Sequence, residues 1–371
     1  MLFGADCNGG GEHGQIQAES GLSTRGSKAS LMVKLIVVDK PIQDPSERPI
    51  GVFQALAKGF DLLTARPYLM LPPLLLDLYL WFGLQLRLPS WTLSIFDTWT
   101  EIANTDPNLM EQFRLAEEGM TELVTHVNLV GLLSSLPVGI PSLMFGRLPI
   151  ENPLGLAPSV KIDQGLLLFI LWFLLMILGQ VLGGQFHFWL VKHLAEEEVQ
   201  HGAWGICMRL VLVGFLLQFG MMFSVFMLLL VASIAALILP ILGLVVGFMG
   251  ATFIFWAILY LVFTPHGIVR YRLGIFRAMM ESVTVVRWNL LGTVGFLALS
   301  LLIMGITNQV WVLPSEDSWY TVLAILGHAL VATTLLAGSY VFYQGRREWM
   351  LAVREARLEQ AQRDRDGRWR A

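Results

Sequence analysis

The sequence is poor in charge. Asp, Glu, Lys and Arg make up only 14% of its 371 residues, whereas ordinary soluble domains contain about a quarter. Hydrophobic residues account for 55%. A soluble core cannot use this much apolar sequence, so the excess is expected to face lipid. The net charge of −3 comes with no basic face, and the sequence therefore predicts no nucleic-acid partner.

Cysteine is also scarce, with only Cys7 and Cys207 in the chain. The orientation derived below places both in or next to the cytoplasm, where thiols stay reduced. We therefore expect no disulfide, and the two cysteines do not have a metal-ligand spacing.

The N-terminus lacks a secretory signal. Residues 1–31 contain seven glycines and no apolar run of signal length, so a disordered segment is expected. Met32 opens a more ordinary beginning, and the start of the protein is expected at either Met1 or Met32.

Long hydrophobic runs are abundant. Six segments are long and apolar enough to span a bilayer, and Pro240 is the expected turn between the third and the fourth because proline interrupts a helix. The pattern predicts an all-α fold, a polytopic transmembrane helical bundle of about six spans with interfacial amphipathic helices. The six segments are residues 67–88, 164–190, 210–239, 241–263, 289–313 and 319–343.

The distribution of basic residues predicts the orientation. Arg and Lys gather before the first span, after the fourth and after the sixth, whereas the long connection 89–163 is acidic. Because basic connections stay in the cytoplasm, we expect a multi-pass protein of the cell (cytoplasmic) membrane with both termini cytoplasmic. The main basic residues are Lys34, Lys40, Arg48, Lys58, Arg66, Arg270, Arg272, Arg277, Arg287, Arg346, Arg347, Arg354 and Arg357.

Four regions follow from this orientation. The first is a disordered Gly-rich N-terminus, and the second is a cytoplasmic segment with an interfacial helix. A six-span membrane domain and a cytoplasmic polar tail complete the chain. The regions are residues 1–31, 32–66, 67–343 and 344–371.

The external cap 89–163 is too long for a simple connector. Asp106 and Pro107 have the residue types of a helix start, and apolar residues then recur at helical spacing. This predicts an amphipathic helix on the outer membrane surface. Prolines punctuate the remainder of the cap, which is expected to be irregular.

Four polar residues within the predicted spans are candidate site residues. A carboxylate at the middle of a span is costly unless it is protonated or paired, so Asp77 should face other helices, and His328 lies at similar depth in the sixth span. The pair can serve a proton or substrate path, or it can be a structural hydrogen bond. Gln180 and Gln218 favour hydrogen bonds between helices.

His193, Glu197 and His201 are spaced i, i+4, i+8 just inside the membrane. Two imidazoles and a carboxylate can bind Zn or Fe. However, the two histidines would lie about 12 Å apart along a helix, too far to share one ion without a helix break. A solvated polar helix is the favoured interpretation, and no metal or other cofactor is expected.

An internal repeat is predicted from residues 51–63 and 274–286, which align without gaps. Each has polar residues at i, i+4, i+7 opposite an apolar stripe, the pattern of a helix lying in the interface. Each precedes an outward-going span, so the repeat would be parallel. A helix that continued straight into its span would contradict the idea.

Residues 51–73 have the pattern of an interfacial helix, then a proline, then a span that opens with further prolines. Residues 274–289 repeat the pattern of an interfacial helix before a span. The layout of about 50–345 resembles a class of bacterial six-span membrane proteins, similar to the membrane domain fused to some glycerophosphodiester phosphodiesterases. This chain lacks the soluble catalytic barrel of those enzymes and its His/Glu metal site. The resemblance therefore implies a membrane fold and no phosphodiesterase activity.

Catalytic signatures such as Gly-x-Ser-x-Gly, His-Glu-x-x-His and the dinucleotide fingerprint are missing from the sequence. We therefore favour an integral membrane protein that is transport-related or an accessory component over an enzyme. Alternatives are the membrane subunit of an ATP-driven exporter, whose ATPase would be a separate chain, and a membrane-bound metalloenzyme using the His193 region. The expected partners are the lipid bilayer and a separate ATPase or another membrane subunit.

Overall fold

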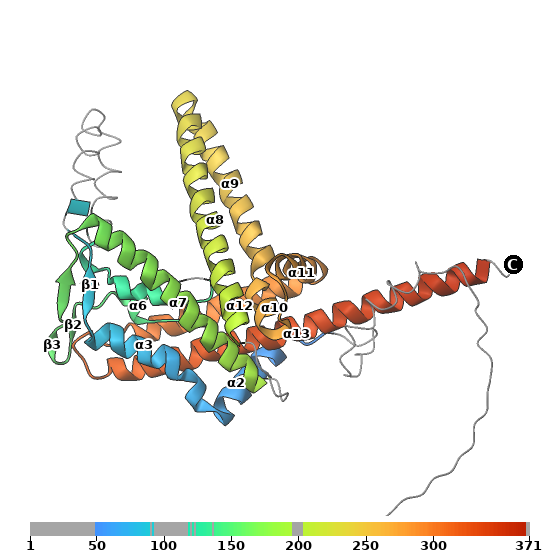
Figure 1. Ribbon diagram of the computed structural model, residues 1–371, viewed down its shortest axis with the longest axis horizontal. Coiled ribbons are helices and arrows are strands. Elements are labelled where there is room, and N and C mark those ends of the chain that lie inside the picture. Colours follow the sequence, from blue (N-terminus) through green and yellow to red (C-terminus); the bar gives the residue numbers. More distant parts are fainter. Residues whose placement is uncertain are drawn as a thin grey trace, which may run out of the picture. The chain divides into compact units, whose positions relative to one another are not determined.

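The computed structural model describes residues 49–89, 91–92, 118, 121, 124–135, 137–194 and 203–368. The expected disordered N-terminus, Cys7, Glu197, His201 and the start of the predicted outer helix at Asp106 lie outside these residues. The described chain is built almost entirely of helices (Figure 1), and the predicted all-α fold class is confirmed.

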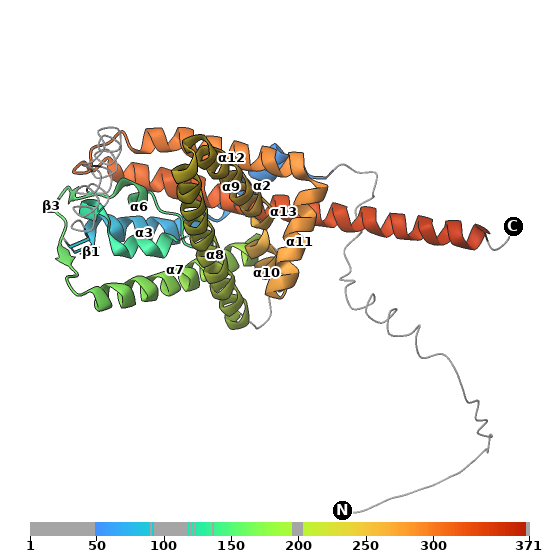
Figure 2. The same ribbon diagram turned by 90° about the horizontal axis from the view of Figure 1, so that it is seen from above.

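Five helices are long and apolar enough to cross a membrane. Most of their apolar side chains point away from the rest of the protein, as helices in contact with lipid require. Figure 2 shows that the fourth and the fifth of them, α12 and α13, run alongside each other. The five are α7 (Gly165–Leu194), α8 (Ala203–Ile238), α9 (Pro240–Leu261), α12 (Leu290–Trp311) and α13 (Thr321–Arg368).

The first predicted span, 67–88, is shorter than expected. A 3-10 turn, η1 (Pro67–Met70), leads into α3 (Leu71–Phe82), and the helix then ends at Gly83 in an extended conformation. Sixteen helical residues reach about 24 Å, less than the roughly 30 Å hydrocarbon core. The helix stops because the next residues form strand β1 (Gln85–Arg87) of a small sheet. The described residues thus contain five long apolar helices and one short apolar helix.

The expected irregular cap contains short regular elements. β1 pairs in parallel with β4 (Ser159–Lys161), and β2 (Glu151–Asn152) forms an antiparallel hairpin with β3 (Gly155–Leu156). A 3-10 helix, η2 (Leu129–Ser134), and a one-turn helix, α6 (Met144–Arg147), complete the described part of the cap. Strands of two or three residues are too short to show an alternation of apolar and polar residues, so the sequence could not predict them.

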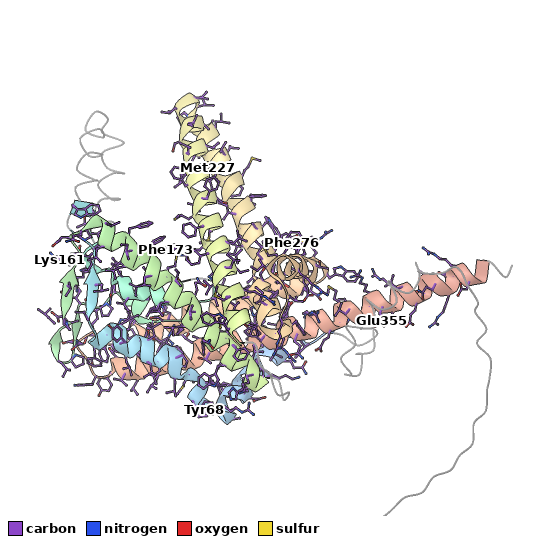
Figure 3. All side chains as sticks on the ribbon, viewed as in Figure 1. Tyr68, Lys161, Phe173, Met227, Phe276 and Glu355 are labelled. Atoms are coloured by element: carbon purple, nitrogen blue, oxygen red, sulfur yellow. The ribbon has the colours of Figure 1, made fainter. Side chains whose placement is uncertain are left out.

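The predicted turn at Pro240 is confirmed. Leu239 has an extended backbone, and Pro240 begins α9. α8 and α9 lie antiparallel as a hairpin, and both views show it running across the direction of α13 (Figures 1 and 2). Figure 3 shows side chains projecting along both edges of this hairpin, including Met227. Its buried apolar residues lie mainly at the start of α8, where Ile206, Leu210 and Val213 join the core.

The fourth predicted span, 241–263, matches α9 closely, and a short helix that the sequence did not suggest follows it. After α9 the chain breaks at Phe263 and forms a second helix, α10 (Thr264–Tyr271). Pro265 cannot donate a helical hydrogen bond. Ser282 of the following helix satisfies two backbone groups at the break. Its hydroxyl accepts from the Phe263 amide at 3.1 Å and donates to the Tyr260 carbonyl at 2.7 Å.

The two predicted interfacial segments have matching local structures. They form α2 (Val52–Ala65) and α11 (Ile275–Trp288), of 14 residues each, behind an extended glycine. Phe53 and Phe276 are 77% and 76% exposed, and the matching alanines two residues later are fully buried. Both helices end at a residue with non-helical backbone, so neither continues straight into the next helix. Superposition of the hairpins that follow, which the repeat requires, remains a prediction.

α13 is the central helix, because α2, α3, α7, α11 and α12 all contact it. Its apolar membrane part continues without a break into the polar tail, so the last span and the expected solvated helix are one element. α2 packs closest to it at Gly59, where a side chain would lie 2.6 Å from the backbone nitrogen of Gly338.

Candidate functional site

Asp77 is fully buried and faces the protein interior from the middle of α3. It accepts hydrogen bonds from the Ser142 hydroxyl and from the amides of Leu143 at 3.1 Å and Met144 at 3.0 Å. These groups form the first turn of α6, whose amides have no helical partners. The carboxylate therefore holds the cap onto α3.

The structure brings Asp77 and His328 together, as the depth of the two residues suggested. His328 Nδ1 on α13 lies 3.5 Å from Asp77 Oδ2, and both side chains are buried. Among the described residues that nitrogen makes no hydrogen bond within the usual limits. Residues 142–144 donate three hydrogen bonds to the carboxylate. The imidazole lies against the same carboxylate without forming a hydrogen bond to it.

Arg147, at the end of α6, ties the same cap to the loop between α12 and α13. Its guanidinium donates to the Pro314 carbonyl at 2.7 Å, while the Glu316 carboxylate accepts from the Ile150 amide at 3.0 Å. Partial burial lowers the pKa of Arg147, and the negative charge of Glu316 opposes this shift. Together with Asp77, these contacts make the cap a structural part of the bundle.

The predicted glutamines lie where α7 and α8 meet. Gln180 is fully buried, donates to the Ser135 hydroxyl at 3.5 Å and packs on Gly214 of α8. Gln218 lies one turn further along α8 and is half-buried. Both positions suit interhelical packing, as their amides suggested.

His193 ends α7 and makes structural contacts. Its Nδ1 lies 2.8 Å from the Trp189 carbonyl, which only an N–H can satisfy. Its own carbonyl accepts from the Arg66 guanidinium at 2.6 Å, and Tyr68 packs edge-on against its ring. Within the described part of the chain no three metal-binding side chains come together. Glu197 and His201 lie outside that part, so the expectation of no metal there stays a prediction.

A second polar cluster lies between α7, α10 and α13, and we name it the histidine–tyrosine cluster: His187, His266, Ser339, Tyr340 and Tyr343. All but Ser339 are less than 7% exposed. His187 Nδ1 lies 2.9 Å from the Tyr340 hydroxyl, and the Tyr340 ring packs on the His266 ring with centroids 4.3 Å apart. Two histidines from different helices therefore share one tyrosine.

The hydrogen bonds of Ser339 determine the tautomer of His266. Ser339 donates its hydroxyl proton to the Leu336 carbonyl at 2.7 Å, so at 2.8 Å it can only accept from His266 Nε2. In the neutral ring, Nδ1 is then an acceptor. This buried nitrogen has no hydrogen-bond partner among the described residues. His266 thus has one acceptor nitrogen inside the bundle with no partner among the described residues.

An ion pair adjoins the cluster on the side of α11. The Tyr343 hydroxyl donates to Glu281 Oε1 at 2.6 Å, and the Arg347 guanidinium donates to both carboxylate oxygens at 2.6 and 3.3 Å. Arg347 also lies 3.8 Å over the Tyr271 ring. The rings of His266 and Tyr343 also contact each other, with centroids 5.7 Å apart. Neighbouring polar side chains therefore lead from His187 on α7, through the cluster and Glu281, to the half-buried Arg347.

The sequence interpretation missed this cluster. The available signal was the Thr-Pro-His-Gly run at 264–267, directly after an apolar span, because a proline and a histidine there mark a helix break with an ionisable group. His187 and Tyr340 lie 153 positions apart. Only the packing of α7 on α13 brings them together.

The fold and the composition of its helices define a multi-pass α-helical membrane protein. Comparison of the chain with family models, with curated proteins and with solved structures gave no match in any of the three.

Proposed function

We propose that this chain is a transport-related component of the cell membrane, in which the histidine–tyrosine cluster takes up and releases a proton. The unpartnered Nδ1 of His266 carries the proposal. An ionisable side chain inside a membrane bundle is costly and is a functional candidate by default. The rings of Tyr340 and Tyr343 both contact the His266 ring. The Tyr340 hydroxyl contacts His187, and the Tyr343 hydroxyl donates to Glu281, which pairs with Arg347 on α13.

Asp77, the first candidate from the sequence, supports this function less well. Its two oxygens accept hydrogen bonds from the cap, which gives the carboxylate a structural role. The accessory-component alternative keeps one supporting observation, the long exposed α8–α9 hairpin, which offers a large apolar face to lipid or to another membrane subunit. Co-purification of an ATPase would favour the exporter version of that alternative.

We expect His266→Gln to slow proton movement by about tenfold or more, because glutamine keeps a donor for Ser339 but cannot accept a proton. The purified chain would be placed in phosphatidylethanolamine/phosphatidylglycerol vesicles with an internal pH-sensitive dye, and a potassium diffusion potential would drive the flux. His193→Gln is the matched control and should leave the flux unchanged. Flux no greater than that of empty vesicles would overturn the proposal.

The proposed orientation, with both termini cytoplasmic, rests on the basic residues that follow α9 and on those in the polar part of α13. A C-terminal green fluorescent protein fusion is expected to fluoresce, because that reporter matures in the cytoplasm. An alkaline phosphatase fusion at Glu118 is expected to be active, because this enzyme requires export. Inactive phosphatase at Glu118 together with full expression would reverse the orientation.

A further inference from the structure

A cavity of about 440 Å³ lies where the end of α11 meets the polar part of α13, and it is lined by Thr284, Arg287, Trp288 and Arg357. Figure 3 labels a side chain on each of the two helices, Phe276 on α11 and Glu355 on α13. The cavity has the size of a small-molecule site. Two of its four lining residues are arginines and none is acidic.

Among the described residues, neither arginine of the cavity forms a salt bridge with a carboxylate. In the part of the chain that the structure describes, the arginine salt bridges join Arg347 to Glu281 and Arg363 to Glu359. Side chains three and four positions away share a helix face, and at those distances neither Arg287 nor Arg357 has an acidic neighbour in the sequence. The cavity is therefore a focus of positive charge.

Trp288 orients one of the two guanidinium groups. Arg357 lies over its ring, 4.9 Å from the centroid, a cation–π contact that restrains the arginine. Thr284 only lines the cavity, because its hydroxyl proton is donated to the Met280 carbonyl at 2.7 Å. The carbonyls of Val285 and Val286, which would repel an anion at the helix end, already accept from the Asn289 amide.

The position along the chain places the cavity at the membrane boundary. α12, an apolar spanning helix, begins at Leu290, two residues after Trp288. Leu291, in the first turn of α12, is 89% exposed, and tryptophan is typical of the level of the lipid headgroups. The arginines of the cavity thus lie on the chain next to the start of an apolar helix.

We propose that Arg287 and Arg357 form a binding site for a phosphate group at the membrane surface, with Trp288 as its aromatic wall. Arginine binds phosphate through paired N–H donors, and basic pockets beside membrane helices bind anionic headgroups. The site lies apart from the histidine–tyrosine cluster, and its test does not depend on transport.

The test measures binding of three probes to the detergent-purified full chain by microscale thermophoresis. Dioctanoyl phosphatidic acid carries the phosphate and the acyl chains, dioctanoylglycerol carries the chains alone, and inorganic phosphate carries the anion alone. We expect the first to bind and the second not to bind. Arg287→Gln combined with Arg357→Gln should weaken binding by about tenfold or more, whereas Arg365→Gln, an exposed arginine on the same helix, should not.

The probes also identify the source of the phosphate. Tight binding of phosphatidic acid with weak binding of inorganic phosphate supports a lipid ligand, and equal binding supports a free phosphate compound. Equal binding of dioctanoylglycerol, or unchanged binding in the double variant, overturns the site. If the glutamine pair does not fold, Arg287→Lys with Arg357→Lys keeps the charge without the planar fork. It should still weaken binding several-fold, and unchanged binding would again overturn the site.

Discussion

Asp77→Leu is expected to lower the free energy of unfolding by about 3 kcal/mol or more. Leucine fills a similar volume but leaves the amides of Leu143 and Met144 and the Ser142 hydroxyl without an acceptor in a buried place. His328 also loses its contact with the Asp77 carboxyl group. The loss should appear as a lower thermal unfolding temperature of the detergent-purified protein.

Asp77→Asn refines the prediction. An amide would be tolerated if the carboxyl group made only one hydrogen bond. The structure shows that both oxygens accept backbone amides, so the asparagine NH2 would face a donor and cost about 1–3 kcal/mol. Asp61→Leu, at an exposed position on α2, is the control and should change stability by less than about 0.5 kcal/mol. Equal melting of all three variants would show that Asp77 does not hold the cap.

Gly183→Ala should destabilise the protein by about 1–3 kcal/mol, and by more if the cap cannot move. The new methyl group would overlap the carbonyl of Val138, which belongs to the cap and not to a neighbouring helix. Backbone atoms cannot rotate away as a side chain can, so α7 and the cap must separate. Thermal unfolding of the variant beside the parent protein measures the effect.

Gly220→Ala is the matched control, because it makes the same change in the interior of a spanning helix. A side chain at Gly220 of α8 would meet nothing within 4 Å. Alanine also favours the helix by about 0.5–1 kcal/mol over glycine, so this variant should be neutral or slightly more stable. If both variants behaved alike, the glycine contact between α7 and the cap would have no energetic role.

The sequence by itself determined the membrane character of the chain and the places where most of its helices begin and end. Apolar runs that are long enough to cross a bilayer must form helices, because in lipid every backbone hydrogen bond must be made within the segment. Pro240 marked a turn for an equally local reason, since proline cannot donate to the preceding turn. The inward-facing Asp77 followed from the cost of a carboxylate in lipid.

The tertiary structure alone decided the length of α3, the strands of the cap and the histidine–tyrosine cluster. α3 ends early because Gln85–Arg87 pair with Ser159–Lys161, more than 70 positions away. α10 forms because Ser282 of α11 satisfies the groups freed by the break before it. His187 and His266 gain their shared partner, Tyr340, only when α7 and α10 pack on α13. The spacing of apolar residues shows which face of a segment must be buried. Which other segment covers that face is decided only when the chain packs.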